Sequence, residues 1–140
     1  MASVFTQILS GDIPGRVVWK DELAFAILTN RPIRPGHVLV VPRQEIDHWL
    51  DMEPALANHV LAIAQSVGKA IQHAFRPAKV GLMIAGLEVR HVHLHLVPID
   101  AVADLDFAKQ DPNVSAEELD RAATKLRDSL RALGYAHFAG

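Results

Sequence analysis

Hydrophobic positions recur along this chain with two different periods, and each period predicts one kind of secondary structure. Apolar runs of roughly four to eight positions are typical of strands, whereas apolar residues at spacings of three and four are typical of helices. Gly and Pro divide these runs because they interrupt regular structure. The predicted elements are a short opening helix before Gly11, strands at 16–19, 23–28, 37–41, 80–85 and 89–97, and helices at 53–75 and after Ser115.

Two segments carry the helical pattern most clearly. In the first, Pro54 suits the first turn, because its missing amide proton is not needed there. The apolar stripe of this helix comprises Leu56, Val60, Ile63, Val67, Ile71 and Ala74. In the second, Ser115 and Glu118 stand at the spacing of a capping box, and Gly134 follows the last apolar position. Its apolar side comprises Leu119, Ala122, Leu126, Leu130 and Leu133.

These elements predict an α+β domain, with a mostly antiparallel sheet, one long helix packed on it and a further C-terminal helix. A chain of 140 residues suffices for one domain with a core and is too short for two ordinary ones. We expect residues 1–103 to form the main domain and residues 104–140 to form a helical extension of the same domain.

Composition narrows the classes of function. The formal net charge of −2 gives no electrostatic reason to expect a nucleic acid or an anionic membrane as partner. The chain has no cysteine, which excludes disulfides, thiolate metal sites and cysteine nucleophiles. Its first ten residues lack the basic residue of a signal peptide, and no apolar run approaches the roughly 20 residues that span a bilayer. We therefore expect a cytoplasmic protein that binds neither nucleic acid nor membrane.

The segment at 88–98 contains three histidines in strict alternation. Side chains of a strand point to opposite faces in turn, so a strand over 89–97 places His91, His93 and His95 on one face. Neighbouring α-carbons in this row lie about 6.6 Å apart at the usual rise of a strand. The other face is largely apolar and can lie against the long helix; its residues are Arg90, Val92, Leu94 and Leu96.

A row of imidazoles can perform nucleophilic and acid–base chemistry. Neutral imidazole is a competent nucleophile, and one ring can attack while a neighbour donates a hydrogen bond to developing charge. Two other interpretations stay open on the residues alone. In the first, the row is inert packing in the core. In the second, a His-x-His pair supplies two ligands to a zinc ion. Against the zinc site, a strand holds the three rings in a line and does not direct them all toward one ion. The other histidines, namely His48, His59, His73 and His137, are interpreted as ordinary polar groups.

The sequence around the row is similar to the signature of the histidine-triad (HIT) family. His91-Val-His-Leu-His95, followed by an apolar strand end and Pro98, resembles the triad itself. Upstream, residues 4–21 and 35–42 resemble the opening and middle of the HINT-type branch, so the resemblance covers residues 3–98. It implies a HIT-like fold, a homodimer whose sheets join across the interface, and hydrolysis or transfer of nucleoside monophosphates through a nucleotidyl-histidine intermediate.

The resemblance also implies roles by position. His93 would be the nucleophile that attacks the α-phosphorus, and His95 would contact phosphate and the leaving-group side. His91 would support the row, and His37 matches a fourth histidine beside it. The expected substrate is a purine nucleotide or nucleotide conjugate, such as a phosphoramidate. The expected nucleotide-binding residues are Val4, Phe5, Ile8, Ile27, Thr29, Asn30 and Glu88.

Several positions depart from the pattern of the family. Leu87 and Glu88 replace a polar pair before the triad, which places a carboxylate at a phosphate-contacting position. Ionised, it would repel the substrate; protonated, it could serve as an acid for the leaving group. Thr29 replaces the ribose-binding aspartate, and the loop before the triad is shortened to residues 84–86. These departures leave open a rival of another class, a nucleotide-binding regulatory module with little catalysis.

Some bacterial relatives hold structural zinc through a Cys-x-x-Cys pair and further histidines. At those positions this chain has Ser3, Thr6 and Glu45, so we expect neither a bound metal nor a cofactor. A zinc-dependent hydrolase that uses the triad histidines stays as a second rival. The helix beyond Ser115 lies outside the resemblance, and it could cover either a partner's active site or the sheet edge.

Overall fold

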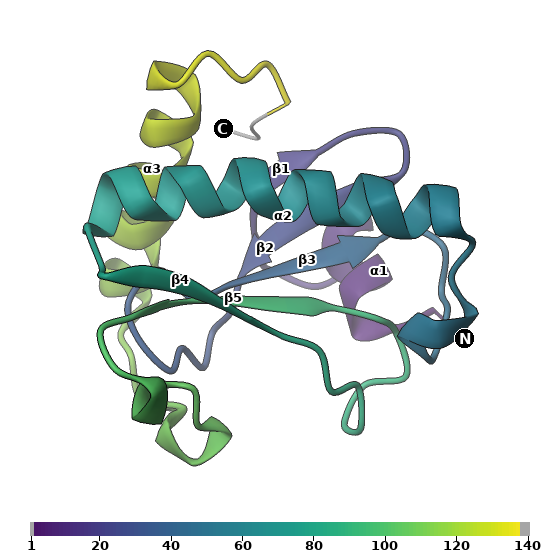
Figure 1. The fold of residues 1–140 in the computed structure, drawn as a ribbon, viewed down its shortest axis with the longest axis horizontal. Coiled ribbons are helices and arrows are strands. Elements are labelled where there is room, and N and C mark those ends of the chain that lie inside the picture. The colour runs from purple at the N-terminus through teal and green to yellow at the C-terminus, as the bar shows by residue number, and fades with distance from the viewer. Residues whose placement is uncertain (1, 138–140) are drawn as a thin grey trace.

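A computed structural model of the chain describes residues 2–137 as a sheet with helices against both of its faces (Figure 1). The regular elements are α1 (Val4–Ser10), β1 (Arg16–Lys20), β2 (Ala24–Leu28), β3 (Val38–Pro42), α2 (Pro54–Phe75), β4 (Lys79–Met83), β5 (Leu94–Ile99) and α3 (Ala116–Ala132). Short 3-10 turns lie at Trp49–Asp51, Val102–Asp104 and Phe107–Lys109. This α+β architecture confirms the predicted fold class.

The five strands form one sheet in the order β1-β2-β3-β5-β4, and every neighbouring pair is antiparallel. β1, β2 and β3 follow one another directly, whereas β5 joins the other side of β3 after the chain has passed through α2 and β4. The register places Leu39 of β3 opposite His95 of β5. The last predicted strand therefore lies in the middle of the sheet, where both of its edges are paired.

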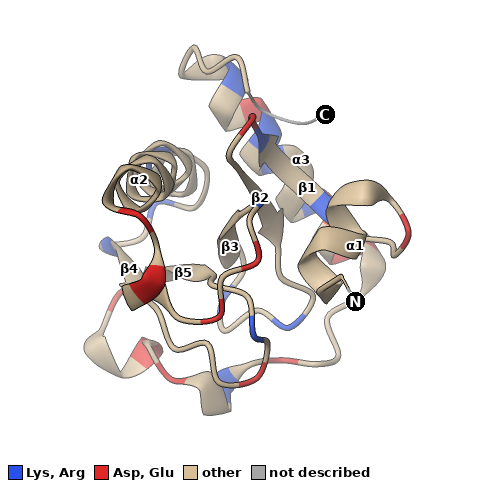
Figure 2. Ribbon diagram, turned by 90° about the vertical axis from the view of Figure 1, so that its right-hand side faces the viewer, with Lys and Arg blue, Asp and Glu red and all other residues tan. Residues whose placement is uncertain are grey.

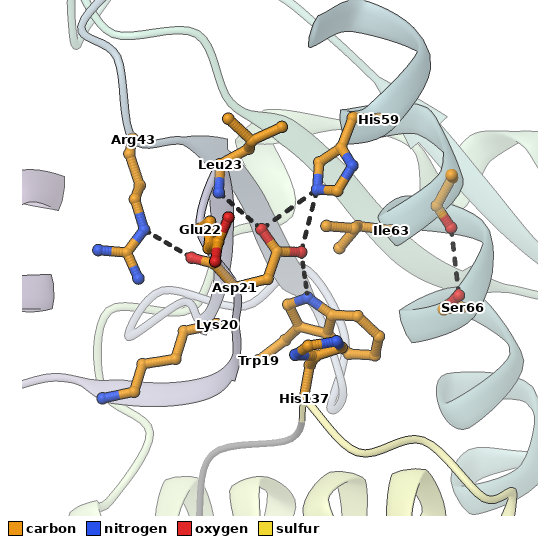
Figure 3. Close-up of a pocket in the computed structure, with 11 residues that line it drawn as sticks. Trp19, Lys20, Asp21, Glu22, Leu23, Arg43, His59, Ile63, Ser66 and His137 are labelled. Carbon is orange, nitrogen blue, oxygen red and sulfur yellow. Dashed lines mark hydrogen bonds and ion pairs between the residues drawn. The ribbon is translucent and has the colours of Figure 1, made fainter.

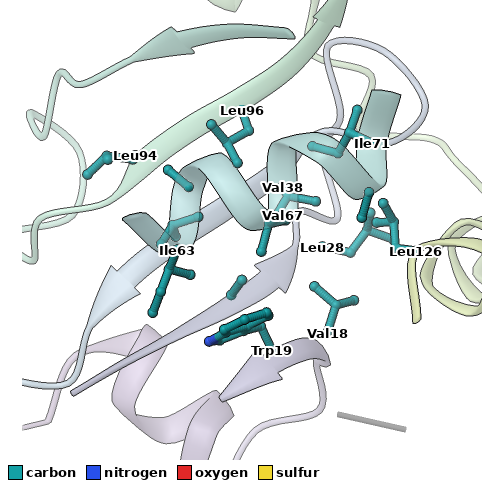
Figure 4. Packing of buried hydrophobic residues seen from close by; sticks show 14 of the residues in the cluster. Val18, Trp19, Leu28, Val38, Ile63, Val67, Ile71, Leu94, Leu96 and Leu126 are labelled. Carbon is teal, nitrogen blue, oxygen red and sulfur yellow. The ribbon is translucent and has the colours of Figure 1, made fainter. Parts of the chain in front are cut away.

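One face of the sheet packs against α2, and α3 lies beside α2 and against β1 (Figures 1 and 4). The helical stripe of α2 puts Val60, Val67 and Ile71 into the main core with no exposed surface, as its spacing predicts. At the start of α3, the Ser115 hydroxyl accepts a hydrogen bond from the backbone amide of Glu118 at 3.1 Å. This cap begins α3, which lies against β1, the edge strand of its own sheet.

The opposite face of the sheet packs against α1. β2 and β3 are buried on both sides, so their residues alternate between the main core and a smaller cluster with α1. The smaller cluster comprises Phe5, Phe25, Ile27, Leu39 and Val41. Because His95 is paired with Leu39 across the strands, its side chain emerges on this same face.

The strand predicted at 89–97 begins only at Leu94, so that part of the prediction is wrong. β3 ends at Pro42, which has no backbone N–H to continue the ladder. The Pro42 carbonyl instead accepts a hydrogen bond from the His91 ring, and the Val92 amide donates to the Ile46 carbonyl at 2.8 Å. Residues 87–93 therefore approach the sheet as an irregular segment.

The charged residues are spread over several loops and helices, with basic and acidic positions interspersed (Figure 2). No helix within residues 2–137 is both long enough and apolar enough to cross a membrane.

Candidate active site

The three histidines of the row share one side of the chain despite the irregular backbone before Leu94. Phe5 of α1 lies against two of them, with ring centroids 5.7 Å from His91 and 4.8 Å from His93. The centroids of His93 and His95 are 4.9 Å apart. The residues that alternate with them point the other way, into the main core, and are Val92, Leu94 and Leu96. The alternation predicted from the sequence is therefore confirmed.

His91 is fully buried and is held at both ring nitrogens. Its Nε2 donates to the Pro42 carbonyl at 2.6 Å, so the proton of the neutral ring sits on Nε2. Its Nδ1 is 2.6 Å from the hydroxyl of Ser3, which then acts as the donor. Neither nitrogen is left for a ligand, so His91 fixes the backbone beside the site.

His93 is held at one ring nitrogen only. Its Nδ1 donates to the His91 carbonyl at 2.7 Å, which puts the ring proton on Nδ1 and leaves the lone pair on Nε2. No partner for Nε2 occurs within the described residues 2–137. Burial lowers the pKa of His93 below its ordinary value, although the bond to the His91 carbonyl and the charge of Glu88 act in the opposite direction. His93 thus presents a neutral imidazole.

His95 and His37 form a chain of hydrogen bonds that begins at the backbone. The amide of Ile33 donates to Nδ1 of His37 at 3.0 Å, so the proton of neutral His37 must sit on Nε2. That Nε2 lies 2.9 Å from Nδ1 of His95, which therefore accepts. The proton of neutral His95 is left on its own Nε2. One local contact, from Ile33 to His37, and one contact across 58 positions, from His37 to His95, thus decide which nitrogen of His95 can donate.

Burial keeps both rings of this pair neutral at pH 7. It lowers the pKa of His37 to about 3 and that of His95 to about 4, and neighbouring histidines lower both further in the same direction. A second ring charge beside the first would be repelled in this apolar surrounding. One neutral ring, His93, therefore offers a lone pair, and its neighbour His95 offers an N–H.

Two adjoining hollows meet at these rings. The α1 hollow, of about 270 Å³, is lined by Val4, Phe5, Ile8, Pro14, Gly15, Arg16, Leu28, Thr29, Asn30, Arg31, Leu39 and the shared residues. The loop hollow, of about 160 Å³, is lined by Ala85, Gly86, Leu87, Phe107 and the shared residues. The shared residues are Glu88, Val89, His93, His95 and Gln110. Each hollow alone is smaller than the roughly 300–1,000 Å³ of typical ligand sites, but together they fall within that range.

Most of the expected nucleotide-binding residues line the α1 hollow, namely Val4, Phe5, Ile8, Thr29, Asn30 and Glu88. Ile27 lies in the cluster behind Phe5 and does not line either hollow. His37 and His91 have no exposed surface and stand behind the lining. Phe107 and Gln110 also line the site, although nothing in the polar segment after Pro98 predicts that it folds back over His95.

Phe107 closes one side of the site. Its ring meets the His95 ring edge-on, with centroids 4.9 Å apart and planes at 70°. The aromatic ring comes from the 3-10 turn Phe107–Lys109, which belongs to the predicted C-terminal extension. The extension therefore contributes to the site through this turn, while α3 lies at the far edge of the sheet.

Ser3, Thr6 and Glu45 also come together, beside His91. The Glu45 carboxylate accepts from the Ser3 amide at 2.5 Å and from the Thr6 hydroxyl at 2.7 Å. Zinc prefers thiolate and imidazole donors, and both nitrogens of His91 are already bonded to protein atoms. This set does not fit zinc. In the described part of the chain, no three His, Cys, Asp or Glu residues are placed to hold a metal ion.

A further hollow, of about 660 Å³, lies away from the histidine row, between the β1–β2 turn and α2 (Figure 3). Its central carboxylate, Asp21, accepts from the Trp19 indole, the His59 ring and the amides of Leu23 and Ala24. Burial would raise the pKa of Asp21, but these donors outweigh it and the pKa is lowered. Because its oxygens are saturated by the hairpin and α2, this carboxylate anchors the turn.

Comparison with known proteins agrees with this geometry. The HIT domain model matches residues 10–102. An uncharacterized HIT-like protein of Methanocaldococcus jannaschii is 32% identical over 99 residues, which are 68% of this chain and 77% of the relative. A bifunctional bis(5'-adenosyl)-triphosphatase/adenylylsulfatase of Arabidopsis thaliana is 30% identical over 122 residues, or 84% of this chain and 65% of that protein.

Among solved structures, a zinc-bound histidine triad family protein of Mycobacterium smegmatis superposes with a TM-score of 0.80 at 29% identity. The superposition covers 95% of this chain and 96% of that one. The HIT domain model thus spans more than half of the 140 residues of this chain. The chain is therefore a member of the histidine-triad (HIT) family.

Proposed function

We propose that the protein is a nucleotide-binding hydrolase or transferase that acts at the α-phosphorus of a nucleoside monophosphate derivative, such as a phosphoramidate. The observation that carries the proposal is the pair of free ring nitrogens at the junction of the two hollows. His93 offers a lone pair on Nε2, because its Nδ1–H is bonded to the His91 carbonyl. His95 offers Nε2–H, because its Nδ1 accepts from His37. A nucleophile and a hydrogen-bond donor thus stand side by side.

The reaction proceeds in two displacements at phosphorus. The lone pair of His93 Nε2 forms a bond to the α-phosphorus, and the bond from phosphorus to the substrate nitrogen breaks. The electrons of that bond stay on the departing nitrogen, which has taken a proton from water, so a neutral amine leaves. Nε2–H of His95 donates to a phosphoryl oxygen and stabilises its charge without giving up the proton.

The second displacement regenerates the enzyme. Water attacks the phosphorus, the bond to His93 Nε2 breaks, and its electrons return to the ring as the lone pair. The proton lost by the water goes to solvent, and a nucleoside monophosphate is released. Nδ1–H of His93 stays bonded to the His91 carbonyl throughout, which stabilises the positive charge that the ring carries while it is bonded to phosphorus.

The α1 hollow suits the nucleoside part of the substrate. Phe5 and Ile8 of α1 and Leu39 of β3 provide an apolar wall for a base. Thr29 and Asn30 line the same hollow with short polar side chains that can bond the sugar hydroxyls. Ile27 supports this wall from behind through its contact with the cluster around Phe5.

The test is the turnover of adenosine 5'-phosphoramidate by wild type and by His93→Ala. Loss of a nucleophile lowers kcat by about 10³-fold or more, and the circular dichroism spectrum should stay that of wild type. His48→Ala, which removes an exposed histidine outside the site, is the matched control and should keep turnover. Retained turnover in His93→Ala contradicts the proposal. Tight binding of AMP by wild type, without cleavage of the phosphoramidate, favours the regulatory module instead.

We also propose that the protein is a homodimer whose sheets join through β4. Within the described residues β4 pairs only with β5, so the backbone groups of its outer edge are unpaired. Leu82 of β4 and Leu61 of α2 are 42% and 48% exposed, and both line a groove of about 420 Å³. Light scattering at micromolar concentration should give twice the mass of the chain; the mass of a single chain contradicts this proposal.

A further inference from the structure

The walls of the loop hollow differ in chemistry from those of the α1 hollow. Besides the two histidines, its lining has one carboxylate and one carboxamide, and its other side chains are apolar. The apolar ones are Ala85, Leu87, Val89 and Phe107, and the polar ones are Glu88 and Gln110. No Lys or Arg of the described chain lines it, whereas Arg16 and Arg31 line the α1 hollow.

This hollow lies where the proposed reaction places the leaving group. In the proposed function the nucleoside occupies the α1 hollow, and both hollows share His93 and His95. The substituent that departs from phosphorus is therefore directed into the loop hollow. Its volume of about 160 Å³ accepts a short chain and is too small for a second nucleoside.

Glu88 is the charged group of this wall. Its side chain is exposed and has no hydrogen bond or ion pair within residues 2–137, so its carboxylate is available to a ligand. It lies close enough to His93 that its charge raises the pKa of that ring against the effect of burial. A negative charge at this distance attracts a cationic leaving group and repels an anionic one.

We infer that Glu88 selects the charge of the leaving group, so that the preferred substrates are nucleoside phosphoramidates of amines with an apolar stem and a second, positively charged amino group. Leu87, which is 93% exposed, and Phe107 cover the stem, and Glu88 pairs with the distant ammonium. Leaving groups that carry carboxylate or phosphate, such as those of dinucleoside polyphosphates, are disfavoured. This inference rests on the proposed function and goes further by fixing the leaving-group class.

The experiment compares kcat/KM for three adenosine 5'-phosphoramidates of similar length. Their amines are 1,4-diaminobutane, butylamine and 4-aminobutanoate, which carry a positive, a neutral and a negative end; diadenosine triphosphate is the fourth substrate. An exposed pair contributes at most about fivefold, so wild type should prefer the diamine over butylamine by about three- to fivefold. The preference over 4-aminobutanoate should be larger, and both should weaken with added salt.

The variants are compared by the ratio of kcat/KM between two substrates. A loss of activity that affects both substrates equally does not change this ratio. Glu88→Gln should bring the ratio of diamine to butylamine close to one, and Glu88→Lys should reverse the preference toward 4-aminobutanoate. Glu22→Gln removes an exposed glutamate at the β1–β2 turn, outside both hollows, and should keep the wild-type ratio.

The outcomes separate the inference from the proposed function. If wild type cleaves the phosphoramidates but Glu88→Gln leaves the ratio unchanged, the charge selection is wrong and the proposed function stands. The charge selection is also wrong if wild type prefers diadenosine triphosphate. If wild type cleaves none of the four substrates, both the proposed function and the inference are wrong.

Discussion

The buried pair of His37 and His95 predicts a steep loss of stability in mild acid. Burial lowers their pKa values from 6.5 to about 3 and about 4, whereas in the unfolded chain both titrate near 6.5. At a pH between the native and the unfolded pKa values, the rings bind protons in the unfolded state but not in the native state. The free energy of unfolding therefore falls as the pH falls. From pH 7 to pH 5 each ring contributes a loss of about 2 kcal/mol, and His93 adds to it in the same direction.

The substitution His37→Gln measures the contribution of one of these two rings to the pH dependence. The glutamine amide keeps a donor toward Nδ1 of His95 but does not titrate, so the slope against pH should fall by about 1.4 kcal/mol per pH unit near pH 5. Urea denaturation at several pH values between 7 and 5 gives the slope for wild type and variant. His48→Gln, which replaces an exposed histidine, should leave the slope unchanged. Equal slopes in wild type and His37→Gln would refute the reasoning.

Two further predictions concern single contacts, and urea denaturation measures both. Ser3→Ala removes the cap of α1 and the hydroxyl bonded to His91, so it should lower the free energy of unfolding by about 1–2 kcal/mol. Ser3→Thr keeps the hydroxyl, so it should lower the free energy of unfolding by less. Equal losses in the two variants contradict this role of the hydroxyl. Gly36→Ala should cost at least about 1 kcal/mol more than Gly11→Ala. Both glycines have a positive φ, but only at position 36 would the new Cβ meet the Phe75 ring, at 2.8 Å, and equal costs contradict this reasoning.

The local elements were predictable because their patterns follow from backbone geometry. The spacing of apolar residues predicted a helix at 53–75, and α2 runs over Pro54–Phe75. The alternation of His91, His93 and His95 predicted that their rings share one side, which the structure confirms. Each of these predictions depends only on the spacing of apolar and polar residues within one segment.

The start of β5 shows where such reasoning stops. The alternation extends back to Val89, yet the strand begins at Leu94, because Pro42 on the neighbouring strand cannot supply another amide. Whether a segment pairs with a strand depends on which strand the tertiary packing places beside it. The spacing of apolar residues within the segment does not contain that information.

By itself, the sequence determined the helices, the α+β class and a row of imidazoles on one side of the chain. The tertiary structure alone decided which nitrogen of each ring is free. The proton of His95 is placed by His37, 58 positions away, and His91 is held by Ser3, 88 positions away. The wall formed by Phe107 likewise comes from a turn outside the motif. Hydrogen bonds of this kind depend on distances between remote segments, and those distances are set only when the core packs.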